Sequence, residues 1–523
     1  METSLIRRAA PLLISALLLH AITALPSSPG AMRIDAWLRP APELLVLLLM
    51  LVLLGDRAAS RALRMAATVT IGVLSILKLA DIAMQMALGR RFNLVADIPL
   101  IDASVRLIAG AVGRIGAVLL VVAAILAAFA IFRSLWWALG RWSRAGVPAA
   151  IPVIALAGLT LAMNPAPMLW NYGAGQIRTA RATTTELAKF RVAAAQDDAA
   201  RIAQPFGLID RDVIFVFIES YGRASFDVPR YAATHLPILR DAAADLDRAG
   251  LAMRSGFLTS PTHGGQSWLA HATFANGLRI EGQTRYRAAL ASGRQTLFHI
   301  AQDAGLRTAA VMPAITRLWP EAREMGFDTV LDAKALDYRG LPFNWVTMPD
   351  QFTLAAMDRK LRGTADAPLL AQVALISSHA PWTPIPSMIP WDQVADGREF
   401  DEMARSGDTP KTVWRDRERV REQYGKSIDY ALRAVTEYAA LHADDPPLLV
   451  LVGDHQAASS IGLDERHEVP IHVIGPDHLV RRTAEWGLTP GLIPEAGSPA
   501  IPMEEMRMNI LRSFSGDAGR PWS

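Results

Sequence analysis

The chain has 523 residues, of which 51% are hydrophobic and 20% charged, an apolar excess for a soluble protein. This length allows two or three domains. The absence of cysteine excludes disulfides, a thiolate metal site and a cysteine nucleophile. The net charge is only +3 and no basic stripe alternates with aromatic residues, which argues against nucleic-acid binding.

Charge is distributed unevenly along the chain. Residues 1–165 contain 15 Lys and Arg against 7 Asp and Glu, whereas the remainder contains 38 against 43. Ten of the eleven histidines lie in the remainder. The sequence therefore divides into a basic, apolar N-terminal part and a mildly acidic C-terminal part.

Five apolar runs in the N-terminal part predict membrane-spanning helices, at residues 9–25, 42–55, 65–88, 115–132 and 147–163. Several of them need flanking residues to cross a hydrocarbon core of about 30 Å. The first run follows Arg7 and Arg8 and also fits a cleaved signal peptide, but the later runs favour a retained span. The semi-apolar stretch 92–109, in a loop with four arginines, is suited to the membrane interface.

The arginines between these runs indicate their orientation. If the spans alternate, one side of the membrane collects Arg7, Arg8, Arg57, Arg61, Arg64, Arg133, Arg141 and Arg144. Because Lys and Arg collect on the cytoplasmic side, we expect five spans and everything after residue 163 outside the cytoplasm. Within the third run, Lys78 and Asp81 are either a functional intramembrane pair or a pair that closes on itself.

The C-terminal part alternates strand and helix patterns. Residues 166–210 predict a juxtamembrane linker helix, with helix-start chemistry at 183–186. From residue 211 we expect strands at 213–218, 308–312, 369–376, 448–452 and 470–474, and helices at 235–249, 267–277, 296–304 and 413–441. The polar run 391–411 interrupts this pattern. Such alternation predicts a mostly parallel sheet covered on both faces.

Two strand ends carry candidate metal ligands. Asp454 and His455 follow the apolar run 448–452 and Gly453. Ligands of open α/β sheets bind outside the carboxyl ends of the strands, and an Asp–His pair there suits zinc or manganese. A satisfied polar turn is the simpler alternative. Strand 213–218 ends in the same way at Glu219, which becomes a third candidate ligand.

A candidate nucleophile lies in the glycine-containing segment 259–271. Ser267 begins a helical run, where helix N–H groups favour an anion. A serine hydroxyl beside a divalent cation loses its proton more readily and can attack phosphorus. Ser267 is alternatively an ordinary helix cap, and Thr262 is the rival nucleophile.

Taken together, four motifs resemble the sulfatase-like branch of the alkaline phosphatase superfamily: Ile218-Glu219-Ser220, Gly264-Gly265-Gln266-Ser267, Ser377-Ser378-His379-Ala380-Pro381-Trp382 and Gly453-Asp454-His455. With several N-terminal spans, the chain is similar to membrane-bound phosphoglycerol and phosphoethanolamine transferases, including lipoteichoic acid synthase. The likeness covers roughly residues 210–475. It implies a transmembrane domain at 1–165, the linker at 166–210 and a sulfatase-like catalytic domain at 211–523.

The resemblance also implies roles for individual residues. Glu219, Asp454 and His455 would hold one manganese or zinc ion, and Ser267 would complete the metal shell and form a phospho-enzyme intermediate. His379 would contact the phosphoryl group or the leaving oxygen, and His467 would lie near the phosphate. A histidine held by backbone groups is the alternative for each of these two. The implied enzyme lies in a bacterial inner membrane with its catalytic domain in the periplasm, and transfers a phospholipid head group to a glycan or glycolipid.

The sequence departs from the family pattern in the head-group region. The Trp-x-Arg element of the synthase-like members has only a partial match in Trp319, with Arg317 nearby, and Met312 stands where a histidine is expected. The choice between glycerol and ethanolamine therefore stays open. Residues 267–271 do not fit the C/S-x-P-x-R motif of true sulfatases, which leaves a membrane-tethered phosphodiesterase or sulfatase as the alternative function.

Overall fold

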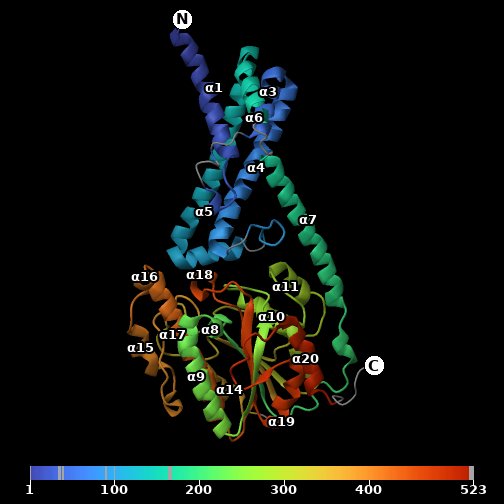
Figure 1. Ribbon diagram of the computed structural model, residues 1–523, viewed down its shortest axis with the longest axis vertical. Helices are drawn as coiled ribbons and strands as arrows, with labels where there is room; N and C mark the ends of the chain where they lie inside the picture. The colour runs from blue at the N-terminus through green and yellow to red at the C-terminus, as the bar shows by residue number, and fades with distance from the viewer. Residues whose placement is uncertain are drawn as a thin grey trace. The chain divides into compact units, whose positions relative to one another are not determined.

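The computed structural model describes residues 2–32, 37, 41–88, 91–98, 101–162, 168–364 and 366–516. The chain divides into two compact units, Met1–Ala188 and Lys189–Ser523, each of which is described by itself (Figure 1). Residue 163, where the fifth predicted span ends, lies outside the described residues.

The first unit is built from helices. They are α1 (Glu2–Thr23), α3 (Pro42–Leu54), α4 (Ala58–Leu88), α5 (Ile101–Trp142), α6 (Ala150–Ala162) and most of α7 (Met168–Ala195). Gly113 interrupts α5 with φ 78° and ψ 162°, so the segment from Ile101 is a separate helix from the apolar one that follows. Glycine adopts this conformation without a Cβ clash.

Two of these helices are long and apolar enough to cross a membrane, by length and composition alone: Ala58–Met86 and Ile115–Trp142. Little of the second is buried, and it exposes apolar side chains such as Leu119 and Phe129. The other three predicted spans coincide with shorter apolar helices, Ala10–Thr23, Pro42–Leu54 and Val147–Ala157. Five spans therefore stay a prediction.

The buried charges of α4 have separate partners. Lys78 Nζ donates to the carbonyl oxygen of Thr23 at 2.9 Å. The carboxylate of Asp81 accepts from Tyr172 Oη and from the backbone N–H of Phe92, each at 2.8 Å. These contacts tie α4 to α1 and α7, which is a structural role for both residues.

The second unit is an α/β domain with one sheet, in the order β4-β3-β5-β1-β6-β7-β2-β8, with β9 beside β2. Strands β3, β4, β5, β1 and β6 pair in parallel, and β7 is antiparallel to β6 and β2. The bounds are β1 (Val213–Ile218), β2 (Ala252–Thr259), β3 (Arg307–Met312), β4 (Thr329–Asp332), β5 (Leu369–Leu375), β6 (Leu448–Gly453), β7 (Glu468–Gly475), β8 (Thr489–Pro490) and β9 (Ala500–Pro502).

Helices cover both faces of this sheet, as the alternation predicts. The longer ones are α9 (Pro229–Arg248), α10 (Ser267–Asn276), α11 (Gln283–Leu290), α12 (Leu297–Asp303), α14 (Asp350–Leu361), α17 (Arg417–Leu441) and α20 (Met506–Phe514). The shorter ones are α8 (Ala224–Asp227), α13 (Glu321–Glu324), α15 (Asp401–Arg405), α16 (Pro410–Val413), α18 (Ser459–Gly462) and α19 (Asp477–Val480).

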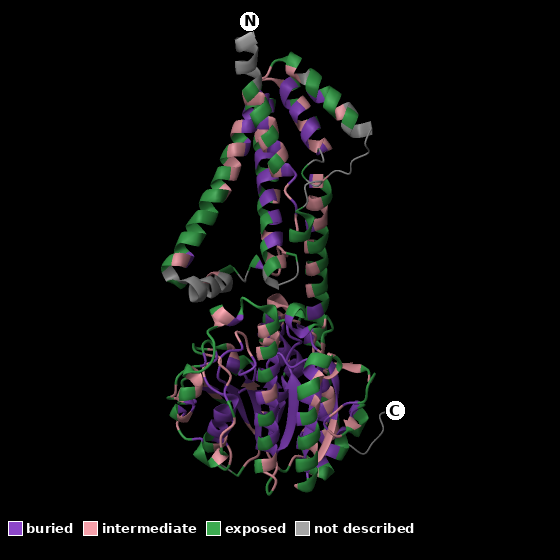
Figure 2. Cartoon of the chain, turned by 60° about the vertical axis from the view of Figure 1, so that its left-hand side comes forward, coloured by how far each residue is buried: buried purple, intermediate pink, exposed green. Residues whose placement is uncertain are grey.

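The central strand β1 shows why both faces of this sheet are covered by helices. Ile214, Val216 and Ile218 belong to one apolar core, with α9, α14 and α17. Val213, Phe215 and Phe217, on the other face, pack in a second core with α10, α12 and α20. Alternate side chains of a strand point to opposite faces, so a continuous apolar run is buried on both. Figure 2 shows the strands buried and the exposed surface on the covering helices.

All five predicted strands are confirmed, with ends within two residues of the prediction. The prediction for the long C-terminal helix is wrong at its start. The chain forms the short α16 first, and α17 begins after Asp416, whose side chain caps it. The helix predicted at 235–249 begins earlier, at Pro229, because proline fits the first helical turn.

Buried His235 gives a stability prediction for this unit. Burial lowers the pKa of His235 to about 4, although its Nε2 lies 3.1 Å from the Gly425 carbonyl oxygen. Below its ordinary pKa of about 6.5 the unfolded chain binds a proton that the folded chain does not. As the pH falls from about 6.5 to 4, we expect the free energy of unfolding of the wild type to decrease by about 1.4 kcal/mol per pH unit relative to that of His235→Gln.

Denaturant unfolding of both proteins across this pH range measures the difference. His478→Gln, which removes an exposed histidine, is the control. Parallel pH profiles for wild type and His235→Gln would contradict a neutral, buried His235.

Candidate active site

The candidate ligands meet because three parallel strands end at one edge of the sheet. Ile218 of β1 is in register with Gly453 of β6 and with Leu375 of β5. The residues that follow these positions therefore start from adjacent points. Glu219 follows β1, Asp454 follows β6, and the loop that carries His379 follows β5.

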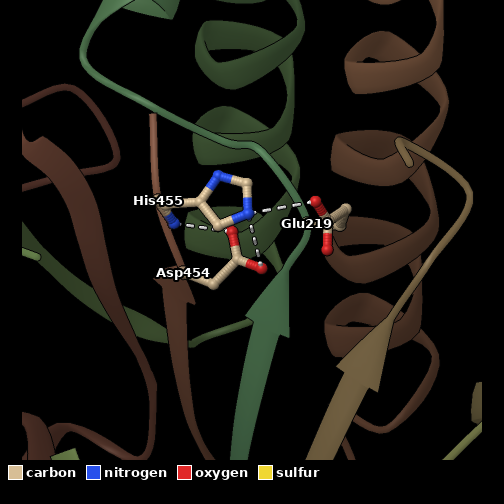
Figure 3. A group of neighbouring side chains, drawn as sticks. All are labelled: Glu219, Asp454 and His455. Carbon is tan, nitrogen blue, oxygen red and sulfur yellow. Dashed lines mark hydrogen bonds and ion pairs between the residues drawn. The ribbon is translucent and has the colours of Figure 1, made fainter. Parts of the chain in front are cut away.

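Glu219, Asp454 and His455 form one buried cluster (Figure 3). Their ligand atoms all lie within 4.8 Å of one another. His455 Nε2 lies 3.2 Å from Glu219 Oε1 and 3.8 Å from Asp454 Oδ2. The predicted convergence of these three side chains is thus present in the structure.

Backbone contacts fix the direction of each ligand. Asp454 Oδ1 accepts from the N–H of Ser220 at 2.8 Å, which leaves Oδ2 toward the cluster. Ser220 adopts φ 58° and its hydroxyl donates to Glu219 Oε1 at 2.8 Å. His455 Nδ1 lies 3.1 Å from the Gln456 carbonyl oxygen, so Nε2 faces the carboxylates. No pattern in the sequence marks Ser220 as an orienting residue.

The buried carboxylates of this cluster favour a positive charge between them. Burial disfavours charge on His455, but Asp454 and Glu219 together raise its pKa to about 9. Burial and the charge of Glu219 raise the pKa of Asp454 to about 7. Burial also opposes ionisation of Glu219, yet the charge of His455 lowers the pKa of Glu219. Two buried carboxylates beside one imidazole therefore favour a cation among them.

Ser267 lies against this cluster. It is the first residue of α10, and its hydroxyl donates to Glu219 Oε2 at 2.9 Å and lies 3.3 Å from His455 Nε2. The turn before it has positive φ at Gly264, Gly265 and Gln266. At Gly264 a Cβ would also approach Ala458 Cα to 3.3 Å, so the glycines permit the tight turn that presents Ser267.

A matching family model decides the identity of this fold. The model described as Sulfatase matches residues 211–486, more than half of the chain. The chain belongs to the sulfatase family. The resemblance drawn from the motifs is confirmed, and with it the assignment as an enzyme of the sulfatase-like alkaline phosphatase superfamily.

Several solved structures are similar to this sulfatase-family enzyme. The lipoteichoic acid synthase LtaP from Listeria monocytogenes is 13% identical over 60% of this chain and 80% of its own, with a TM-score of 0.36. The phosphoethanolamine transferase EptA from Neisseria meningitidis is 13% identical over 86% and 85%, with a TM-score of 0.42. The phosphoglycerol transferase GacH from Streptococcus pyogenes is 13% identical over 63% and 91%, with a TM-score of 0.36. A search of curated proteins found no match.

A cavity of about 440 Å³ opens beside the cluster of the sulfatase-family enzyme. Ser267, His379 and Trp319 all line it, together with Glu219 and Asp454. His379 Nδ1 lies 2.7 Å from the Ala380 carbonyl oxygen, and its ring stacks on Trp345 at 4.1 Å. The predicted residues from three distant segments therefore share one cavity.

Three other candidates are not part of the lining described for this cavity. Arg317 is exposed. His467 Nδ1 lies 3.3 Å from the Ser260 carbonyl oxygen, and its ring lies 5.5 Å from that of His263. Thr262 is buried, and its hydroxyl has no hydrogen-bond partner among the described residues. The structure thus places Ser267, rather than Thr262, against the cluster.

The donor set fits a divalent cation. Two carboxylates, one imidazole and one hydroxyl are the oxygen and nitrogen ligands that zinc and manganese accept. Glu219, Asp454 and His455 would hold the ion, and Ser267 would stand at its open position. We expect Asp454→Asn to weaken Mn²⁺ or Zn²⁺ binding by at least about 100-fold, because the loss of orienting partners alone costs 10- to 100-fold.

Calorimetric titration of metal-stripped full-length protein measures this affinity. Glu422→Gln, which neutralises an exposed carboxylate paired with Lys426, is the control and is expected to bind like the wild type. Equal affinities in Asp454→Asn and the control would show that the ion binds elsewhere.

Proposed function

We propose that this enzyme transfers a phospholipid head group, phosphoglycerol or phosphoethanolamine, to a glycan or glycolipid of the cell envelope through a phosphoserine at Ser267. The observation that carries this proposal is the contact of the Ser267 hydroxyl with a buried carboxylate–imidazole cluster at the N-terminus of α10. A bound Mn²⁺ or Zn²⁺ would lower the pKa of a coordinated oxygen and stabilise negative charge at phosphorus.

In the first half-reaction Ser267 Oγ attacks the phosphodiester of the lipid. Its proton leaves along the hydrogen bond to Glu219 Oε2, an O–P bond to Oγ forms, and the bond from phosphorus to the diacylglycerol oxygen breaks. N–H groups at the start of α10 favour the negative charge of the phosphoryl group. His379, whose Nδ1 is engaged by Ala380, has Nε2 available to protonate the departing diacylglycerol.

In the second half-reaction the acceptor hydroxyl attacks the phosphoserine. His379 Nε2 takes the acceptor proton, the new O–P bond forms, the bond from phosphorus to Ser267 Oγ breaks, and Glu219 returns the proton to Oγ. Trp319, which lines the cavity, is a further proposed substrate contact, whereas His467 and Arg317 lie outside the lining described for it. With water as the acceptor, the same site would act as a phosphodiesterase or sulfatase-type hydrolase.

Intact-mass spectrometry tests the proposed reaction. Full-length protein mixed with vesicles of phosphatidylglycerol or phosphatidylethanolamine is expected to gain the mass of the donor's phosphoryl-linked head group at Ser267 and to release diacylglycerol. Unmodified protein alongside free head group at every time point would favour the hydrolase.

We also propose a bacterial inner-membrane location, with five spans and the catalytic unit in the periplasm. The two candidate spans and the arginine distribution support it. Because the chain has no cysteine, a single cysteine engineered into the second unit is the one thiol of this protein that a reagent outside intact spheroplasts can label. Labelling only after lysis would refute the periplasmic placement.

A further inference from the structure

The cavity beside Ser267 is mainly apolar and aromatic. Its lining includes Trp268, Trp319 and Trp345, and none of the described residues that form it is Lys or Arg. Anionic and polyhydroxylated groups are usually bound by charged or hydrogen-bonding donors, whereas tryptophan faces attract cations. The lining therefore suits a ligand that brings its own positive charge.

A carboxylate outside the metal-binding cluster also lines this cavity. Apart from Glu219 and Asp454, the acidic residue among the described lining residues is Glu321, half-buried at the start of α13. Burial and the charge of Glu321 raise the pKa of Tyr286 to about 12, although a hydrogen bond from Trp319 acts to lower it. Tyr286, Trp319 and Glu321 therefore lie together, with an aromatic surface beside a negative charge.

Two buried polar atoms on the lining lack partners among the described residues. They are Gln372 Oε1 and His271 Nε2, and both side chains are at least nine-tenths buried. A buried polar atom without a hydrogen bond costs free energy, which a ligand can recover. The amide oxygen accepts hydrogen bonds, and a neutral imidazole nitrogen can do the same. An ammonium group, which only donates, matches both.

We propose that this cavity is the head-group subsite and that it selects an ammonium-bearing head group over glycerol, with Glu321 as the specificity-determining residue. This inference rests on the proposed head-group transfer. The phosphate lies at Ser267, and the ammonium group reaches the wall formed by Glu321 and Trp319. Glycerol offers no charge to Glu321 and gains little from the tryptophan faces, so it binds more weakly.

The transfer test uses full-length protein and vesicles that contain phosphatidylethanolamine or phosphatidylglycerol at equal fractions. We expect the Ser267 adduct to form at least about tenfold faster from phosphatidylethanolamine than from phosphatidylglycerol, the effect of one charge-assisted contact. Glu321→Gln should remove most of this preference by raising the KM for phosphatidylethanolamine.

The matched control is Glu324→Gln, which neutralises an exposed carboxylate on the same short helix outside the cavity lining. It should behave like the wild type. Faster labelling by phosphatidylglycerol, or identical preferences in Glu321→Gln and Glu324→Gln, would overturn the assignment of the subsite while the transfer reaction stands.

A binding test examines the proposed subsite independently of the transfer reaction. O-phosphoethanolamine and glycerol phosphate are titrated calorimetrically into full-length protein with Mn²⁺ or Zn²⁺. We expect tighter binding of O-phosphoethanolamine, weakened about tenfold by Glu321→Gln. If this holds but no lipid modifies Ser267, the transfer reaction fails and the subsite stands. Equal binding of the two ligands overturns the subsite.

Discussion

Ser267→Ala is expected to lower the kcat/KM of head-group transfer by at least about 1,000-fold, because the variant has no oxygen to form the phosphoserine. Metal binding should fall far less, since Glu219, Asp454 and His455 keep their positions without the hydroxyl. The measurement combines transfer rates, intact mass after exposure to lipid, and metal titration. The expected pattern is loss of the adduct with the ion still bound.

The matched variant is Thr262→Ala, which removes the rival hydroxyl. Because Thr262 Oγ1 has no partner among the described residues, its removal leaves no hydrogen bond broken. We expect transfer within about threefold of the wild type, the range of a mild packing change. An adduct that survives Ser267→Ala and disappears in Thr262→Ala would reassign the nucleophile.

The convergence of Glu219 with Asp454 and His455 could be predicted because a local pattern marks each of the two strand ends. Two apolar runs predict parallel strands, and parallel strands present their carboxyl ends at one edge of the sheet. Register then brings together side chains more than two hundred residues apart. Ser267 could be placed at a helix start from its glycines and the apolar run that follows.

The head-group side of the cavity could not be predicted in this way. Trp345 and Gln372 come from a loop and the middle of β5, and only tertiary packing brings them to Ser267. The family pattern pointed to Arg317, which is exposed, whereas the neighbouring Glu321 lines the cavity. Strand β2 was missed because Ala252–Thr259 mixes polar and apolar residues, as suits its place near the edge of the sheet.

Gly453→Ala is expected to damage stability and metal binding together. A Cβ at Gly453 would lie 1.8 Å from the carbonyl oxygen of Tyr221 and 3.0 Å from Val469 Cβ. The backbone must move to relieve this clash, and overpacking of this kind costs about 1–3 kcal/mol or more. The movement separates the end of β6 from the turn after β1. It therefore weakens the bond from Ser220 N–H that orients Asp454.

Two further glycine variants separate these effects. Gly282→Ala places a Cβ in open space at φ −174° and should change neither property. Gly475→Ala brings a Cβ 3.1 Å from the Pro447 carbonyl oxygen, at the opposite end of β7 from the cluster. It should reduce stability and leave metal affinity unchanged. Unfolding midpoints and metal titrations of the three variants make the comparison. Equal losses of metal affinity in Gly453→Ala and Gly475→Ala would contradict this prediction. They would show that Asp454 keeps its position without the close contact between the ends of β1 and β6.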